Sequence, residues 1–131
     1  HDWTLLQSAM KTPLATNQIE MSVVENSAFT NGDLAFLQEF GVPPMAWSPL
    51  AGGALFRGDN PKLLSLLNEI GAGDVAAAAV AWLLAHPARI MPVLGTNNPS
   101  RIAKLDAACA ITIDRERWFE VFEAANGCEV A

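Results

Sequence analysis

The chain of 131 residues has few basic residues, few cysteines, no long hydrophobic run and no tyrosine. Fourteen acidic residues outnumber eight lysines and arginines, and the net charge of -6 argues against nucleic-acid partners, which are bound through cationic surfaces. No apolar run approaches the roughly 18 residues that cross a bilayer, and no signal peptide opens the chain, so we expect no membrane partner. Cys109 and Cys128 lack metal-ligand spacing and disulfide density, which favours reduced thiols and a cytoplasmic location.

Apolar residues are abundant: they make up 51% of the chain, whereas 17% is charged. The length suffices for one hydrophobic core and not for two ordinary domains. A chain this apolar either has an internal sheet that is well covered by its own helices, or it normally packs against further protein. It starts at His1, and the apolar residues that follow have helical spacing with no helix start before them. We therefore interpret residues 1–131 as one portion of a longer protein.

Strands and helices are expected to alternate along the chain. The expected strands cover residues 14–21, 45–48 and 90–94. The expected helices begin near residues 2, 33, 61, 75, 99 and 115. Strands that alternate with helices of about ten residues pair in parallel through crossover connections. Three strands make a poor independent sheet, and a barrel needs eight strands and about 250 residues. The order therefore favours an α/β architecture that is part of a barrel.

Several short motifs, in order and in register, resemble the aldo-keto reductase family. They are Gln7-Ser8, residues 17–20, 45–50, 80–84 and 93–96, and Arg101. The resemblance covers essentially the whole chain and implies a partial TIM (β/α)8 barrel, with strands six to eight and their helices. It also implies an NADP(H)-dependent oxidoreductase that interconverts carbonyls and alcohols in the intact protein. The family's catalytic Asp, Tyr, Lys and His belong to the first four strands. Since this chain has no tyrosine, we expect it to be inactive alone.

The resemblance assigns cofactor roles to residues that follow the first two strands. Gln18 is expected near the carboxyl end of its strand, where barrel enzymes place their sites, and the family's glutamine holds the nicotinamide amide. The alternative is a polar residue facing solvent. Trp47 occupies the position of the ring that stacks on the nicotinamide, although a strand tryptophan is otherwise a core residue. Ser48 and Leu50 match contact positions in a loop of small residues that approaches the pyrophosphate.

The strongest cluster follows the third strand and consists of Gly95, Thr96, Asn97 and Arg101, with Lys104 behind it. A hydroxyl and backbone amides before a helix form a natural anion site, and a guanidinium binds phosphate through two hydrogen bonds. The resemblance implies that this cluster binds the adenosine 2′-phosphate and selects NADP(H). Gly95 departs from the family's usual lysine, and Lys104 stands where an adenine contact is common. Lys104 is therefore a second candidate for the phosphate.

Two alternatives belong to other classes. An isolated portion of a barrel has bare strand edges, which favour a non-enzymatic interaction module that associates with a second copy of itself. A flavodoxin-like nucleotide-binding domain also has parallel strands and helices, but it requires a phosphate loop after the first strand, and none is present. Outside the cofactor positions, we expect Cys109 in the core, His86 at a helix end, and residues 82–84 on a helix face packed against the strands. Asp74 is expected to cap the helix that follows it. The last helix, after Asp114, is expected to bury Trp118, Phe119, Val121 and Phe122.

Overall fold

A computed structural model of the chain describes residues 2–129, and within that range three short strands are interleaved with helices. The strands are β1 (Gln18–Glu20), β2 (Met45–Trp47) and β3 (Met91–Pro92). The α-helices are α1 (Asp2–Ala9), α2 (Asp33–Glu39), α3 (Pro61–Ile70), α4 (Val75–Leu84), α5 (Pro99–Leu105) and α6 (Arg115–Asn126). Three 3-10 helices, η1 (Ser27–Phe29), η2 (Ala51–Arg57) and η3 (Asp106–Ala110), complete the order. The expected alternation of strands and helices is confirmed.

The three strands form one parallel sheet in the order β1-β2-β3. Ile19, Ala46 and Pro92 are in register and share one face, and Ala46 is fully buried there. Their neighbours in the sequence point to the opposite face, because successive side chains of a strand alternate. On that second face Trp47 is 41% and Met91 42% exposed. The sheet therefore has one face covered by helices and one open face.

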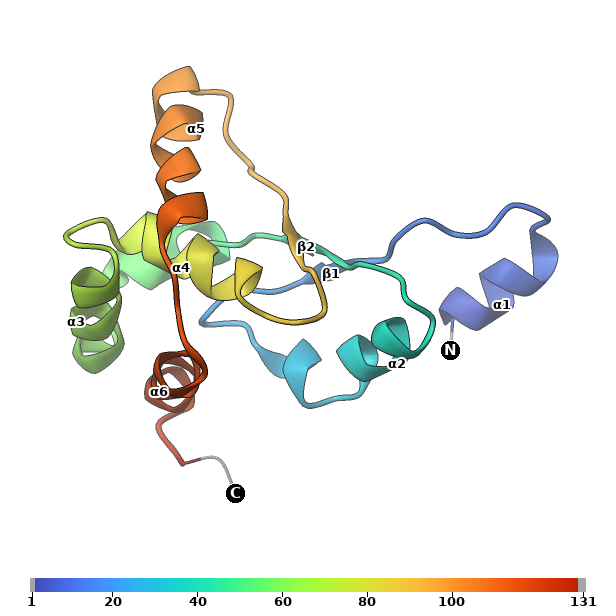
Figure 1. Cartoon of the computed structure of the whole chain (residues 1–131), viewed down its shortest axis with the longest axis horizontal. Coiled ribbons are helices and arrows are strands. Elements are labelled where there is room, and N and C mark those ends of the chain that lie inside the picture. Colours follow the sequence, from blue (N-terminus) through green and yellow to red (C-terminus); the bar gives the residue numbers. More distant parts are fainter. Residues whose placement is uncertain (1, 130–131) are drawn as a thin grey trace.

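Helix α4 lies at the centre of the covered side. Seven of its ten residues are buried, which its alanine-rich sequence permits because small side chains let neighbouring elements approach closely. It packs against α3 and η3, and α3 packs in turn against α6. Figure 1 shows α3, α4, α5 and α6 gathered at one end of the molecule, whereas an extended segment carries α1 to the other end.

Two tryptophans join α4 to α6. The rings of Trp82 and Trp118 are stacked, with centroids 4.6 Å apart and planes 9° from parallel. Each indole N–H also donates to the backbone carbonyl of the other residue, at 2.9 Å from Trp82 and 3.0 Å from Trp118. Trp82 is fully buried, so this reciprocal pair satisfies two indole donors without water.

The strands are shorter than the expected ranges of 14–21 and 90–94. The pairing of β1 with β2 starts where Met45 donates to the Asn17 carbonyl, because Pro43 and Pro44 have no N–H group to extend it backwards. Met91 of β3 donates to the Pro44 carbonyl just before β2, and Val93 after β3 donates to the Ala46 carbonyl of β2. Pro92 between them has its nitrogen directed away. Pro92 is therefore compatible with an edge strand.

Three packing expectations were wrong. Cys109 is exposed in η3 instead of lying in the core, and Leu84 is 40% exposed although Trp82 and Leu83 are buried. In α6 only Val121 and Ala124 are buried, and the aromatic residues expected in the core beside Val121 are half-buried. The reason is that α6 covers the outside of α3 and α4, and no element within residues 2–129 covers the outer face of α6. His1, Val130 and Ala131 lie outside the described residues.

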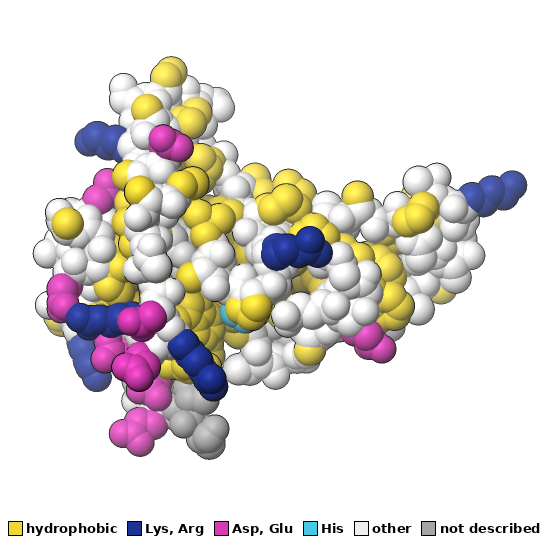
Figure 2. All heavy atoms as spheres, in the orientation of Figure 1, with side chains coloured by type: hydrophobic (Ala, Val, Ile, Leu, Met, Phe, Trp, Pro, Cys, Tyr) yellow, Lys and Arg dark blue, Asp and Glu magenta, His cyan; other side chains and the backbone are white. Residues whose placement is uncertain are grey.

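Acidic side chains gather on one part of the surface. Figure 2 shows acidic side chains over the part of the molecule that holds α3 and α6, and apolar side chains over much of the rest of this face. Arg117 bridges Glu69 of α3 and Glu120 of α6 there. Among residues 2–129 no single helix is long and apolar enough to cross a bilayer; only α3 and α4 taken together, bent by 82°, meet that length and composition.

Candidate functional site

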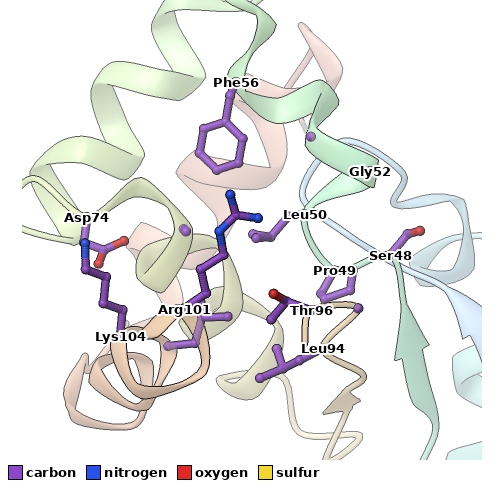
Figure 3. A pocket seen from close by; sticks show the side chains of 14 residues that line it. Ser48, Pro49, Leu50, Gly52, Phe56, Asp74, Leu94, Thr96, Arg101 and Lys104 are labelled. Carbon is purple, nitrogen blue, oxygen red and sulfur yellow. The ribbon is translucent and has the colours of Figure 1, made fainter. Parts of the chain in front are cut away.

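A cavity of about 680 Å³ opens beside the carboxyl ends of β2 and β3 (Figure 3). Its walls come from the segment after β2, the first turn of α4, the segment after β3, and α5. The lining residues are Ser48, Pro49, Leu50, Gly52, Gly53, Phe56, Asp74, Ala76, Leu94, Gly95, Thr96, Arg101, Lys104 and Leu105. Ligands of parallel α/β sheets bind outside this end of the strands, so the position favours a ligand site.

The segment after β2 turns sharply to form one wall. Ser48 and Ala51 have φ of 51°, and Gly52 and Gly53 have φ of 58° and 88°. The turn is held by backbone hydrogen bonds from Ala51 to Ser48, at 2.7 Å, and from Gly53 to Leu50, at 2.9 Å. Left-handed backbone costs energy at a serine or alanine, and such residues concentrate at functional sites. This wall thus presents small residues and closely approachable backbone to the cavity.

The wall after β3 is built differently from the sequence expectation. The Asn98 side chain accepts hydrogen bonds from the N–H groups of Ser100, at 3.0 Å, and Arg101, at 3.4 Å. Asn98 therefore caps α5 and occupies the amides that we expected to bind an anion. The Thr96 hydroxyl accepts from the Asn98 N–H at 3.2 Å and keeps its own proton to donate. The start of α5 therefore has fewer free amides than expected, and the side chains of this wall are the groups left to meet a ligand.

Two cations and one acid line this cavity. Arg101 and Lys104 project from successive turns of α5, and Asp74 stands at the start of α4. Figure 3 shows Arg101 extending toward Phe56 and Lys104 extending toward Asp74. Within the part of the chain that the structure describes, neither cation forms an ion pair, because the bridges found there belong to Arg117. Both remain available to a negatively charged ligand.

The structure brings six of the nine predicted cofactor residues together in this cavity: Ser48, Leu50, Gly95, Thr96, Arg101 and Lys104. Gln18, Trp47 and Asn97 are not among its lining residues. Gln18 is the first residue of β1 instead of lying near its carboxyl end, because β1 is shorter than expected. Gln18 and Trp47 share the open face of the sheet, on adjacent strands. Asn97 is exposed in the loop between Thr96 and the cap of α5.

Among the cavity residues that were not predicted, two have side chains able to act on a ligand, Asp74 and Phe56. Asp74 was identified as the cap of α4, which is confirmed by a 2.9 Å hydrogen bond from the Ala77 N–H, but its place in the cavity wall was not foreseen. Phe56 is 51% exposed at the cavity mouth, although a phenylalanine is ordinarily buried. A large aromatic residue shortly after a glycine-rich turn was the signal available in the sequence.

His86 is the one histidine among the described residues, and it lies away from this cavity. Burial lowers the pKa of His86, whose ring stands edge-on to Phe29 with centroids 5.1 Å apart. Its Nδ1 accepts from the Ala88 N–H at 3.2 Å, so the ring serves the turn after α4. A second cavity of about 410 Å³ borders His86 and Trp118, and a third of about 340 Å³ borders Trp3 and Leu14.

Solved structures of aldo-keto reductases resemble this chain in fold. A thermostable aldo-keto reductase bound to the inhibitor epalrestat matches with a TM-score of 0.81, at 20% identity, over 92% of this chain and 43% of that one. An aldo/keto reductase from Klebsiella pneumoniae in complex with NADP and acetate matches with a TM-score of 0.70, at 24% identity, over 88% of this chain and 42% of that one. The fold is thus that of part of an aldo-keto reductase barrel.

Sequence comparisons name the family. The profile of the Aldo/keto reductase family matches residues 1–126, and the chain belongs to this family. It is 55% identical over 133 aligned residues to a 6-dehydroglucose reductase of Agrobacterium fabrum, covering 99% of this chain and 45% of that protein. It is 39% identical to an uncharacterised oxidoreductase of Bacillus subtilis, covering 99% of this chain and 46% of that one. The chain therefore spans about half the length of these relatives.

Proposed function

We propose that this chain forms strands six to eight of the barrel of an NADP(H)-dependent carbonyl reductase and carries the cofactor-binding half of its site. The observation that carries the proposal is the cavity in which Arg101, Lys104 and Thr96 stand free to bind a phosphate. Its position beside the strand ends, next to an open sheet face bearing Trp47, suits an extended ligand with an anionic end and a planar end.

Each predicted residue has a role that its chemistry supports. Arg101 binds the 2′-phosphate through its planar guanidinium, with Lys104 and the Thr96 hydroxyl beside it. The turn from Ser48 to Leu50 brings backbone close to the pyrophosphate, and Gly95 and Asn97 shape the loop below it. Trp47 stacks on the nicotinamide, and the Gln18 amide pairs with the carboxamide. The bound cofactor supplies the hydride that reduces a carbonyl carbon.

The proton donor is expected from the remainder of the protein. A carbonyl oxygen that receives a hydride must also gain a proton, and this chain has no tyrosine to supply one. We therefore infer that the 131-residue chain alone has no reductase activity. The Agrobacterium relative is a 6-dehydroglucose reductase, which supports a small carbonyl compound of the sugar class as substrate of the intact protein.

Replacing Arg101 with alanine in the intact protein tests the cofactor assignment. The Arg101→Ala variant should bind NADPH about 1.5–3 kcal/mol more weakly, the worth of hydrogen bonds to a charged group, whereas NADH binding should barely change. Arg115→Ala on α6 removes a cation that does not line the cavity and is the matched control. Both dissociation constants are measured by titration calorimetry. Equal losses for the two cofactors would refute the assignment of Arg101 to the 2′-phosphate.

We also propose that the 131-residue chain, when it is separated from the rest of the barrel, associates with a second copy of itself. The open sheet face exposes Trp47 and Met91, and the outer edges of β1 and β3 have no strand partner among residues 2–129. Bare edges and an apolar face both favour pairing.

A further inference from the structure

The acid in the cavity wall is held firmly in place. Asp74 uses its Oδ1 to accept the Ala77 N–H at 2.9 Å, and its own backbone N–H donates to the Gly71 carbonyl at 3.0 Å. At Gly71 a side chain would collide with the Asp74 backbone, so the turn between α3 and α4 closes tightly around this residue. Its position is therefore set by the backbone of two helices.

The carboxylate of Asp74 lines the same cavity as the two cations of α5. Of the charged side chains that line the cavity, Arg101 and Lys104 are positive and Asp74 alone is negative. Figure 3 shows the Lys104 side chain extending toward Asp74. Because Oδ1 is occupied by the cap, Oδ2 is the oxygen left to act on a ligand or on Lys104. A phosphate in this cavity would thus meet an opposing charge as well as two attracting ones.

We propose that Asp74 is a specificity-determining residue that weakens the preference of the cavity for a 2′-phosphorylated nucleotide over the unphosphorylated one. The proposal rests on the proposed cofactor site. A carboxylate repels a phosphate and partly offsets the field of Lys104, whereas it accepts a hydrogen bond from a free ribose hydroxyl. Acidic side chains select the 2′-hydroxyl and arginines select the 2′-phosphate in dinucleotide sites, and this cavity contains both. The site consequently tolerates both forms of the nucleotide.

The substitution Asp74→Asn removes the charge and preserves the cap. Asparagine already caps α3 in this chain, where Asn60 accepts from the Leu63 N–H at 3.1 Å. Asp114 caps α6 in the same way, accepting from the Arg117 N–H at 2.8 Å, and it lines the second cavity instead of this one. Asp114→Asn is therefore the matched control for loss of a capping carboxylate.

The test measures binding of adenosine 2′,5′-bisphosphate and of 5′-AMP to the intact protein by calorimetry. In Asp74→Asn the ratio of the two affinities should rise in favour of the bisphosphate by about threefold to tenfold at low ionic strength. The rise should shrink in high salt, and Asp114→Asn should leave the ratio unchanged. A ratio that stays constant or falls in Asp74→Asn overturns the proposal. A wild-type protein that binds neither nucleotide overturns the cofactor site itself, which is a separate result.

Discussion

The reciprocal tryptophan pair should be a principal source of stability, and Trp82→Phe is the substitution that measures it. Phenylalanine keeps an aromatic ring in the stack but removes the indole N–H that donates to the Trp118 carbonyl at 2.9 Å. The phenyl ring is also smaller than the indole, so part of the space that the indole filled is left empty, at a position that is fully buried.

The expected loss follows from these two terms. A hydrogen bond of this kind contributes about 0.5–1.5 kcal/mol net. The apolar surface lost from the larger ring is about 40–60 Å², which is worth about 1–1.5 kcal/mol at roughly 25 cal/mol per Å². Trp82→Phe should therefore lower the free energy of unfolding by about 1.5–3 kcal/mol. Trp118→Phe should cost less, because Trp118 is half-buried.

Urea unfolding of the intact protein, followed by far-ultraviolet circular dichroism, checks this value. With a slope of about 1–3 kcal/mol per molar urea, Trp82→Phe should move the midpoint by about 0.5–3 M. The control is Trp47→Phe, because Trp47 is 41% exposed, and its midpoint should barely move. The two substitutions in the pair should not be additive, since the residues touch. A Trp82→Phe midpoint within error of the wild type would refute the reasoning.

Three further predictions concern other elements. Gly71→Ala should cost about 1–3 kcal/mol of stability because the new side chain meets the Asp74 backbone, whereas Gly95→Ala, with open space around it, should be nearly neutral in the same urea titration. Burial lowers the pKa of His86 below its ordinary value of 6.5, so the unfolded chain takes up the proton first. The free energy of unfolding should then fall as the pH drops below about 6.5, and His86→Gln should flatten that slope; an unchanged slope contradicts it. The separated 131-residue chain should sediment as a self-associated species, and a single 14.0 kDa species that binds no apolar dye would contradict this.

Local signals in the sequence were sufficient for helices and insufficient for strand lengths. Asn60 and Pro61 start α3, and Asp74 starts α4, as their capping chemistry predicts. The length of β1 depends instead on its neighbour β2, because Pro43 and Pro44, which precede β2, have no N–H groups to hydrogen-bond with β1. No local pattern in residues 14–21 contains that information.

The candidate site was predictable where the residue types themselves suit a phosphate and unpredictable where a residue has two roles. Arg101 and Thr96 were predicted because a hydroxyl-bearing loop before a helix and a guanidinium suit a phosphate, and because the resemblance to the family assigns them that role. Asp74 has a complete local explanation as a helix cap, so nothing in its neighbourhood indicates a ligand. For Asn98 the error is the opposite one: the sequence predicted free amides for an anion at the start of α5, but the Asn98 side chain accepts hydrogen bonds from two of them.

The exposed position of Trp47 makes its intrinsic fluorescence a probe of the open face of the sheet. Of the four tryptophans, Trp82 is fully buried, Trp3 and Trp118 are half-buried, and Trp47 is exposed on the open face of the sheet. A water-soluble quencher such as acrylamide therefore reaches Trp47 first, and the quenchable part of the emission comes chiefly from this indole. Whatever covers the open face, whether a nicotinamide ring, the remaining strands or a second copy, shields the same indole and shifts its emission to the blue.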